Sequence, residues 1–213
     1  MDNFNNHEKT KKIVFSSLKV NSNFVNDKKT FLSKLDKSKK GEIDEKIVSI
    51  IQLINYKPDY YTTSSCSGRV YLWRGGTKKN QMERLRVSHE LVKDSFFELK
   101  EINELKKLSF KEITLKGLIW LRLEDFILHI CCRNLESANL LLQEARQWYK
   151  KSSILSANKK IMVEIRGSEF MEMPLYENGK LLFNGDLSWL KQEVNSRMNR
   201  IWEKEEEFKE NTK

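Results

Sequence analysis

The stretch Thr62-Thr63-Ser64-Ser65-Cys66-Ser67-Gly68-Arg69 separates two runs of β-branched and aromatic residues. Residues 60–63 and 70–73 are typical of β-strands, so we expect a polar loop between two strands. The small side chains let a ligand approach the backbone, Gly68 permits a positive φ, and Arg69 offers a planar guanidinium to phosphate or carboxylate. An ordinary serine–glycine hairpin loop is the alternative. The length of the stretch, its cysteine and its final arginine favour a ligand-binding loop.

Hydrophobic periodicity around this stretch predicts an α+β fold. Upstream, apolar residues recur at helical spacing across 24–35 and 43–54, with a charged segment, 36–41, between the two helices. Downstream, we expect strands at 85–87, 113–115, 117–123, 126–132, 161–166, 170–175 and 181–183, and helices at 90–107, 135–150 and 187–201.

This pattern predicts mixed or antiparallel sheets with packed helices. We expect a flexible arm over residues 1–23, followed by one α+β domain over residues 24–213. The second half of the chain repeats the order of expected strands and helices in the first half, which is consistent with two related βα halves.

Charge and composition narrow the class of partner. Of the 213 residues, 39 are Lys or Arg and 30 are Asp or Glu, so the net charge is +9. A basic balance favours polyanions, nucleic acid first, although lysine-rich surfaces also serve solubility and thermostability. The N-terminus lacks an apolar signal segment, no apolar run could cross a bilayer, and three cysteines do not make a disulfide framework. We therefore expect a cytoplasmic protein without a membrane partner.

Motifs on both sides of the opening stretch match one enzyme family in order and spacing. The stretch itself fits TTSSC-[small]-GR, residues 36–44 fit D-x-S-x-K-G-x-x-D, and residues 126–133 fit F-x-L-H-x-x-C-R. Val87-Ser88-His89, residues 160–166 and Pro174-Leu175 complete the series. Across residues 24–205 the chain resembles the third enzyme of wybutosine synthesis, a tRNA methyltransferase family, and its archaeal homologues.

The resemblance implies a reaction and its partners. Members of the family transfer a methyl group from S-adenosylmethionine to N4 of a 4-demethylwyosine-type guanosine derivative, 3′ of the anticodon of tRNA-Phe. The implied partner is the anticodon loop of tRNA. Three alternatives stay open: a non-catalytic RNA-binding protein, a diverged paralogue acting on a related modified base, and an enzyme that uses another small molecule.

Cofactor binding requires a site outside the common nucleotide fold. None of the eight glycines lies in a G-x-G-x-x-G pattern, so we expect a non-Rossmann fold. The hydroxyl-rich stretch is the candidate site for the methionine moiety, with Arg69 at its carboxylate or at an RNA phosphate. Its residues are Ser64, Ser65, Cys66, Ser67, Gly68 and Arg69.

The reaction also requires a base for the ring-nitrogen proton, and Asp44 and His89 are the catalytic candidates. Asp44 as a carboxylate could accept the proton directly, whereas His89 could accept it only when neutral, with an ordinary pKa near about 6.5. The alternative role for Asp44 is to cap the following helix.

His129 lies within an expected strand, where a lone histidine is commonly a hydrogen-bonded core residue. The resemblance assigns it to substrate binding instead. His89, His129 and Cys66 lack the close spacing of metal ligands, so we expect no metal site.

Basic segments are candidates for RNA contacts. Ser38, Lys39 and Lys40 could bind phosphate, and aromatic residues beside basic ones, as in Trp73-Arg74, could stack on bases. Where relatives have G-F-R-x-S-G, this chain has Trp148-Tyr149-Lys150-Lys151-Ser152-Ser153, and only Ser152 matches. This departure leaves room for a specialised paralogue. The further candidates for substrate or RNA binding are Arg133, Lys150, Lys151, Ser152 and Arg166.

Overall fold

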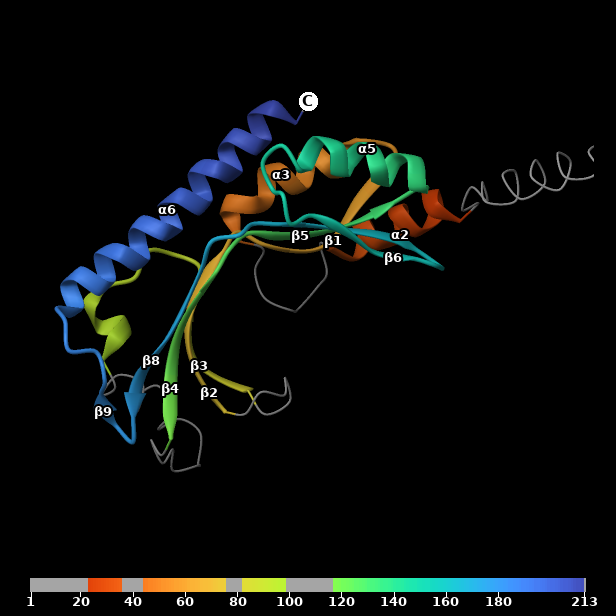
Figure 1. Ribbon diagram of the computed structural model, residues 1–213. Helices are drawn as coiled ribbons and strands as arrows, with labels where there is room; N and C mark the ends of the chain where they lie inside the picture. The colour runs from red at the N-terminus through yellow and green to blue at the C-terminus, as the bar shows by residue number, and fades with distance from the viewer. Residues whose placement is uncertain (1–22, 36–43, 76–81, 99–116, 213) are drawn as a thin grey trace, which may run out of the picture.

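The computed structural model describes residues 23–35, 44–75, 82–98 and 117–212 as an α+β structure with two antiparallel sheets (Figure 1). Sheet A has the order β1 (Tyr60–Cys66), β5 (Ile127–Cys132), β7 (Ile161–Arg166), β6 (Ser153–Ala157). Sheet B has the order β3 (Met82–Ser88), β2 (Arg69–Gly75), β4 (Leu118–Glu124), β8 (Phe170–Glu177), β9 (Lys180–Leu181). The helices are α2 (Phe24–Leu35), α3 (Glu45–Tyr56), α5 (Leu135–Ala145) and α6 (Leu187–Asn211), with a 3-10 turn, η2 (Asp94–Phe97). Rossmann sheets are mostly parallel, so the non-Rossmann prediction is confirmed.

The chain crosses from one sheet to the other at three places, which together form the junction. β1 passes into β2 through Ser67 and Gly68, β4 into β5 through Asp125 and Phe126, and β7 into β8 through residues 167–169. These crossings are neighbours because β5 pairs with β1 and β7, while β4 pairs with β2 and β8. Figure 1 shows the strands bending through the junction as nearly continuous ribbons. The strands on either side of Ser67 and Gly68 therefore belong to different sheets and form no hairpin.

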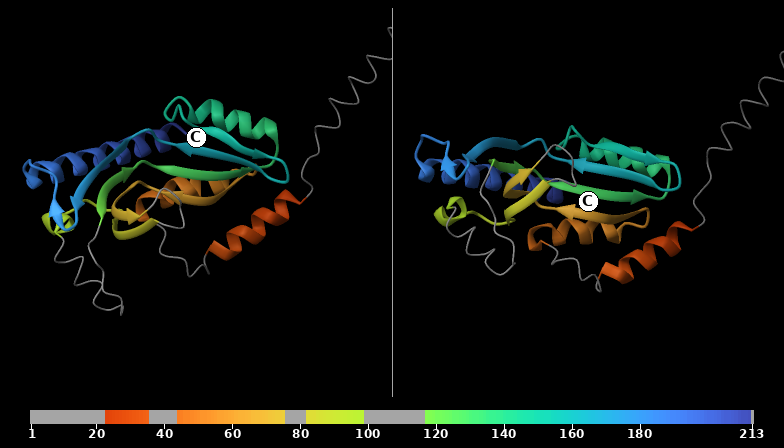
Figure 2. Two further views of the ribbon diagram at one scale, coloured as in Figure 1. Left: turned by 60° about the horizontal axis from the view of Figure 1, so that its bottom comes forward. Right: turned by 90° about the horizontal axis from the view of Figure 1, so that it is seen from below.

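One apolar core lies between the two sheets and the helices α3, α5 and α6 (Figures 1 and 2). Alternate residues of β4, namely Ile119, Leu121 and Leu123, are fully buried in it. Since strand side chains alternate between faces, the residues between them lie on the opposite side, which we call the inner face of each sheet. α6 contributes its buried stripe to this core: Leu190, Val194, Met198 and Ile201.

The inner faces point into the angle between the two sheets. α2 covers the far end of the inner face of sheet A, where Phe24 packs against Tyr61 and Cys131. No other helix of the described ranges lies on this side (Figure 1). Within the described ranges, no helix therefore covers the polar and aromatic residues of the two inner faces near the junction.

Several predicted elements differ from the structure. Within the expected helix 90–107, residues 91–98 contain only η2, and its Phe96 and Phe97 are both buried in the core. The helix expected over 135–150 ends at Ala145, and the strand expected over 181–183 is limited to β9. β6 was not predicted, since only Ile154 and Leu155 in it are large and apolar. Residues 1–22, 36–43, 76–81 and 99–116, which include the expected arm and the expected strand 113–115, lie outside the described residues.

Each sheet draws strands from both halves of the chain: β1 lies beside β5, and β2 beside β4. The repeated order that suggested two related βα halves therefore does not produce two separate sheets. Within the described ranges, no helix is long and apolar enough to cross a membrane.

Candidate active site

The opening stretch is mostly strand, which corrects the expected loop. Ser64, Ser65 and Cys66 belong to β1, and only Ser67 and Gly68 connect it to β2. Gly68 has φ +95°, as predicted, and a Cβ there would stand 3.2 Å from Ile201 Cγ2 and 3.3 Å from the Glu124 carbonyl oxygen. Gly68 is therefore required both for its backbone conformation and for the close approach of α6.

Asp44, Ser67 and His89 meet at this connection. The Ser67 hydroxyl donates to Asp44 Oδ2, and His89 Nδ1 lies 3.5 Å from the same oxygen and 3.1 Å from the Gly68 carbonyl oxygen. Cys66 Sγ lies 3.7 Å from His89 Nδ1. The Asp44 side chain is only 11% exposed, so its negative charge is stabilised mainly by protein groups and not by water. The predicted proximity of Asp44 and His89 to the hydroxyl stretch is confirmed.

In the folded protein the pKa of Asp44 is lowered and the pKa of His89 is raised. Burial raises the pKa of Asp44, but the hydrogen bonds from His89 and Ser67 outweigh it and leave that pKa below its usual value. The hydrogen bond to Asp44, followed by the contact with Cys66, raises the pKa of His89 to about 10. At neutral pH the pair is therefore a carboxylate beside an imidazolium.

Asp44 occupies the N-cap position of α3, but its side chain makes no capping hydrogen bond. The backbone of Lys46 is close enough to help lower the pKa of Asp44. The carboxylate instead faces Ser67 and His89, which weakens capping as its main role.

α6 closes this cluster from the core side. Trp202 Nε1 donates to the Ser67 carbonyl oxygen over 3.1 Å, and Lys46 Nζ lies 4.1 Å from the centre of the Trp202 ring. Glu205, one turn further on, is 2% exposed, and its Oε1 has no hydrogen-bond partner within the described residues. Burial, with the nearby charge of Asp44, raises the pKa of Glu205 to about 10, so this carboxyl is neutral at pH 7.

Arg69 does not present a free guanidinium, in contrast to the expectation. Its Nε and Nη2 donate to Glu124 Oε2 over 2.9 and 2.6 Å, and the Tyr71 hydroxyl donates to Glu124 Oε1 over 2.6 Å. The guanidinium of Arg69 is thus oriented by the carboxylate of Glu124 on the neighbouring strand. The Arg69 side chain still lines a cavity, described next.

This junction cavity has a volume of about 360 Å³ and opens on the inner side of both sheets. Three predicted site residues, Arg69, Lys151 and Arg166, converge on it from β2, the end of the α5–β6 connection and β7. Carboxylates and one aromatic ring complete the lining: Glu124, Asp125, Ile127, Gly167, Ser168, Glu169 and Phe170.

Asp125 fixes the shape of the junction. Its Oδ1 accepts from the Phe126 backbone and its Oδ2 from the Glu169 backbone, both over 2.6 Å. Burial nevertheless raises the pKa of Asp125. A Cβ on Gly167 would stand 1.9–2.2 Å from the Asp125 carboxyl atoms, so glycine is required there by close approach alone.

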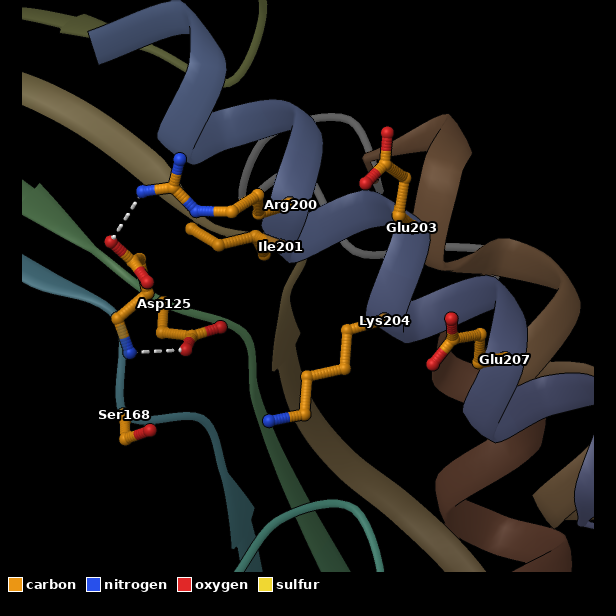
Figure 3. A pocket seen from close by; sticks show the side chains of 8 residues that line it. Asp125, Ser168, Arg200, Ile201, Glu203, Lys204 and Glu207 are labelled. Carbon is orange, nitrogen blue, oxygen red and sulfur yellow. Dashed lines mark hydrogen bonds and ion pairs between the residues drawn. The ribbon is translucent and has the colours of Figure 1, made fainter. Parts of the chain in front are cut away.

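A second cavity, of about 350 Å³, lies on the other side of Asp125, against α6. Figure 3 shows Arg200 and Lys204 of α6 facing Asp125 and Ser168 across it. Arg200 Nη2 lies 3.2 Å from Glu169 Oε1, which also accepts from Arg197 over 2.9 Å. These ion pairs attach α6 to the β7–β8 crossing.

A hydroxyl, an imidazole and a carboxylate form a row on the inner face of sheet A. Ser64 Oγ lies 3.1 Å from His129 Nδ1, and His129 Nε2 lies 3.0 Å from Glu164 Oε2. His129 and Glu164 are register partners, two residues along from Ile127 and Arg166, which line the junction cavity. His129 is thus hydrogen-bonded at the surface of the sheet and not in the core.

Other predicted RNA-binding residues lie elsewhere. Ser152 is buried, and its hydroxyl donates to the Tyr149 carbonyl oxygen over 2.7 Å and stabilises a turn. Arg133 lies at the opposite end of β5, where it pairs with Asp59 at 2.5 Å. Lys150 is exposed beside Lys151. Ser38, Lys39 and Lys40 fall outside the described residues.

Sequence reasoning missed the glutamates of the site. Glu124 and Glu164 acquire their roles through cross-strand pairs with Arg69 and His129, a register that local pattern does not give. Glu205 lies on a charged helix, where a carboxylate is normally solvated. A single signal was available: Glu164 lies within the motif at residues 160–166.

Comparison with known proteins agrees with these motifs. The family described as Methyltransferase TYW3 matches residues 26–213. A tRNA wybutosine-synthesizing protein 3 homolog of Pongo abelii is 35% identical over 159 residues, which cover 71% of this chain and 57% of that protein. The chain thus spans a little over half the length of this curated relative.

Archaeal proteins match over nearly their whole length. The tRNA(Phe) 7-((3-amino-3-carboxypropyl)-4-demethylwyosine(37)-N(4))-methyltransferase 1 of Pyrococcus abyssi is 32% identical, with 91% of this chain and 97% of that protein covered. The solved structure of the PH1069 protein from Pyrococcus horikoshii has a TM-score of 0.76 at 32% identity, and the match covers 91% of this chain and 98% of that one. The chain therefore belongs to the Methyltransferase TYW3 family.

Proposed function

We propose that this protein is a cytoplasmic S-adenosylmethionine-dependent tRNA methyltransferase that methylates N4 of a 4-demethylwyosine-type guanosine derivative next to the anticodon of tRNA-Phe. Family membership and the name of the Pyrococcus abyssi relative support this reaction. The observation that carries it is the junction cavity, where one predicted cofactor residue, Arg69, and two predicted substrate residues, Lys151 and Arg166, converge on one space.

The lining of the junction cavity suits S-adenosylmethionine. Its volume of about 360 Å³ falls within the range of small-molecule sites. Arg166 can bind the methionine carboxylate, and Glu169 and Glu124 can accept from the ammonium and the ribose hydroxyls. Phe170 offers a ring face to the adenine or the sulfonium. When bound, the cofactor supplies an activated methyl group.

The protein's own groups position the acceptor and take up its proton. Asp44, a carboxylate with a lowered pKa, is the proposed proton acceptor, because His89 is already charged at neutral pH. His89 then holds Asp44 in place and stabilises its charge. Positioning contributes much of the rate in such a transfer, on the order of 7–11 kcal/mol in favourable cases.

The test is methylation of tRNA-Phe isolated from cells that lack this gene. We expect purified protein and S-adenosylmethionine to add one methyl group to the modified guanosine, as seen by mass spectrometry of its nucleosides. Calorimetry should show binding of S-adenosylmethionine by the protein alone. Tight tRNA binding with neither cofactor binding nor methyl transfer would replace this proposal with the non-catalytic alternative.

A further inference from the structure

Two tryptophans and two arginines lie together on the inner face of sheet B; one of the arginines, Arg84, is exposed, and the other three residues are half-buried. Trp73 of β2 and Trp120 of β4 are register partners whose rings stack at 6.1 Å and 21°. The guanidinium of Arg122 lies 4.9 Å from the centre of the Trp73 ring. Arg84 of β3 completes the inner-face patch, which we define as Trp73, Arg84, Trp120 and Arg122.

Tyr71 forms the floor of this patch. Its ring is fully buried, with the guanidiniums of Arg84 at 5.3 Å and Arg122 at 5.9 Å from its centre. The Tyr71 hydroxyl accepts from Arg122 over 3.2 Å and donates to Glu124. Contacts with Tyr71 therefore hold the patch in place, and no described helix lies against the inner face of sheet B (Figure 1).

The charges of the patch suit an anionic partner with flat rings. Arg122 pairs with Glu172, but Arg84 is exposed and has no carboxylate partner in the described part of the chain. Stacked indoles with guanidiniums beside them bind the faces of unpaired bases and the adjoining phosphates. A base-paired duplex would keep those base faces covered.

The patch leads directly to the junction cavity. Phe170 lines that cavity, and its ring lies 5.8 Å from the guanidinium of Arg122. Glu124, which orients Tyr71, lines it as well. A strand of nucleotides lying on the patch would therefore end with one base at the proposed site of methyl transfer.

We propose that the inner-face patch binds unpaired nucleotides of the anticodon loop. Trp120 and Trp73 stack on bases, and Arg84 binds a phosphate. The proposal rests on the proposed function for the choice of tRNA. It adds a surface that lies outside the motifs of the family and includes three residues, Arg84, Trp120 and Arg122, that sequence reasoning did not identify.

The test measures binding of a fluorescent anticodon stem-loop of tRNA-Phe to the full-length protein by anisotropy, across a salt series. Trp120→Ala should weaken binding about tenfold and leave the slope of log affinity against log salt unchanged, since stacking carries no charge. Arg84→Ala should weaken binding and flatten that slope by about 0.7, the value for one phosphate contact of a single strand. A fully paired RNA duplex of equal length should bind both variants as it binds the parent protein.

Matched controls lie on α6, away from the inner face. Trp189 is 56% exposed and stacks on Phe183 at 6.3 Å, so Trp189→Ala removes a similar stacked ring. Lys209→Ala removes one charge near the end of α6. Both controls should bind the stem-loop as the parent does, and Trp120→Phe should restore most of the affinity lost in Trp120→Ala.

The outcomes separate the patch from the reaction. Unchanged stem-loop affinity in Trp120→Ala and Arg84→Ala, with methylation intact, overturns the patch and leaves the proposed function standing. Patch-dependent binding without methyl transfer by the parent protein supports the patch and refutes the reaction. If the variants change only the sedimentation of the protein, the patch is a contact between copies of the chain and the proposal is wrong.

Discussion

The Asp44–His89 contact is a charged pair whose stability depends on pH. The pKa of His89 is raised from 6.5 to about 10, so its contribution is complete below pH 6.5 and is lost as the pH rises toward 10. The pKa of Asp44 is lowered below 3.8, so its contribution is present above that pH and is lost as the pH falls through the folded-state value.

We therefore expect the melting temperature of the parent protein to fall more steeply between pH 7 and 10 than that of His89→Gln. Asp44→Asn removes the partner that raises the pKa of His89, so it should flatten the same limb. Thermal unfolding of the three proteins at matched ionic strength is the measurement. Parallel curves above pH 7 would show that His89 is not stabilised as an imidazolium.

Asp44 is also the residue whose chemical role is easiest to test. Asp44→Asn keeps the shape of the side chain and removes its basicity, so single-turnover methylation should fall by about 10²–10⁴, the usual share of a general base. His89→Gln should lose less, because it only positions Asp44. Cofactor binding by calorimetry is the control, and a full rate in Asp44→Asn with cofactor bound would exclude Asp44 as the acceptor.

Some residues of the site are predictable from sequence and others are not. The positive φ of Gly68 and the meeting of Asp44, Ser67 and His89 follow from residue type and motif. The Arg69–Glu124 pair joins residues 55 positions apart and depends on the register of β2 against β4. The register of a strand is set by packing of the whole sheet. No local sequence pattern could therefore have shown that the guanidinium of Arg69 is paired with Glu124.

At the scale of elements, the junction depends on one carboxylate. Asp125 holds the β4–β5 and β7–β8 crossings together through two backbone hydrogen bonds, and Gly167 leaves the space that it fills. This arrangement suggests a double-mutant cycle.

Asp125→Ala should lower the free energy of unfolding by about 1–3 kcal/mol, because two partly buried backbone donors lose their acceptor. Gly167→Ala should cost at least as much, since its Cβ displaces the same carboxylate. The double variant should be no worse than Gly167→Ala alone, because the clash disappears with Asp125. Additive losses in urea unfolding would show that Gly167 acts independently of Asp125.

Strand patterns predicted most elements but not their partners. β1 and β2 were recognised from β-branched and aromatic runs, yet alternation alone cannot say that consecutive strands enter different sheets. The expected helix over 90–107 was wrong within its described part for a related reason. Its residues Val92 and Phe96 have helical spacing and are buried in the core, but the backbone that carries them is a 3-10 turn preceded by irregular chain.

At the scale of the whole molecule, the net charge of +9 favours binding of tRNA where basic side chains line the junction cavity. Lys151 lines the junction cavity, whereas Lys150 beside it does not. Lys151→Glu should therefore weaken tRNA binding and flatten its log–log salt slope by about 0.7–0.9, while Lys150→Glu changes it less. Equal slopes in both variants would place the RNA away from this end of the cavity.

The repeated crossing between sheets has a consequence for synthesis on the ribosome. In sheet A, β5 has a neighbour on both sides only once β7 has formed, and in sheet B the same holds for β4 and β8; α6 packs on the common core last. Neither sheet can thus be completed while the second half of the chain is still in the exit tunnel. Contacts of such long sequence separation fold slowly, in milliseconds to seconds for comparable topologies. Until α6 emerges, the apolar strands β4 and β5 are exposed to pairing with other chains, so we expect the nascent chain to bind chaperones that recognise exposed strands.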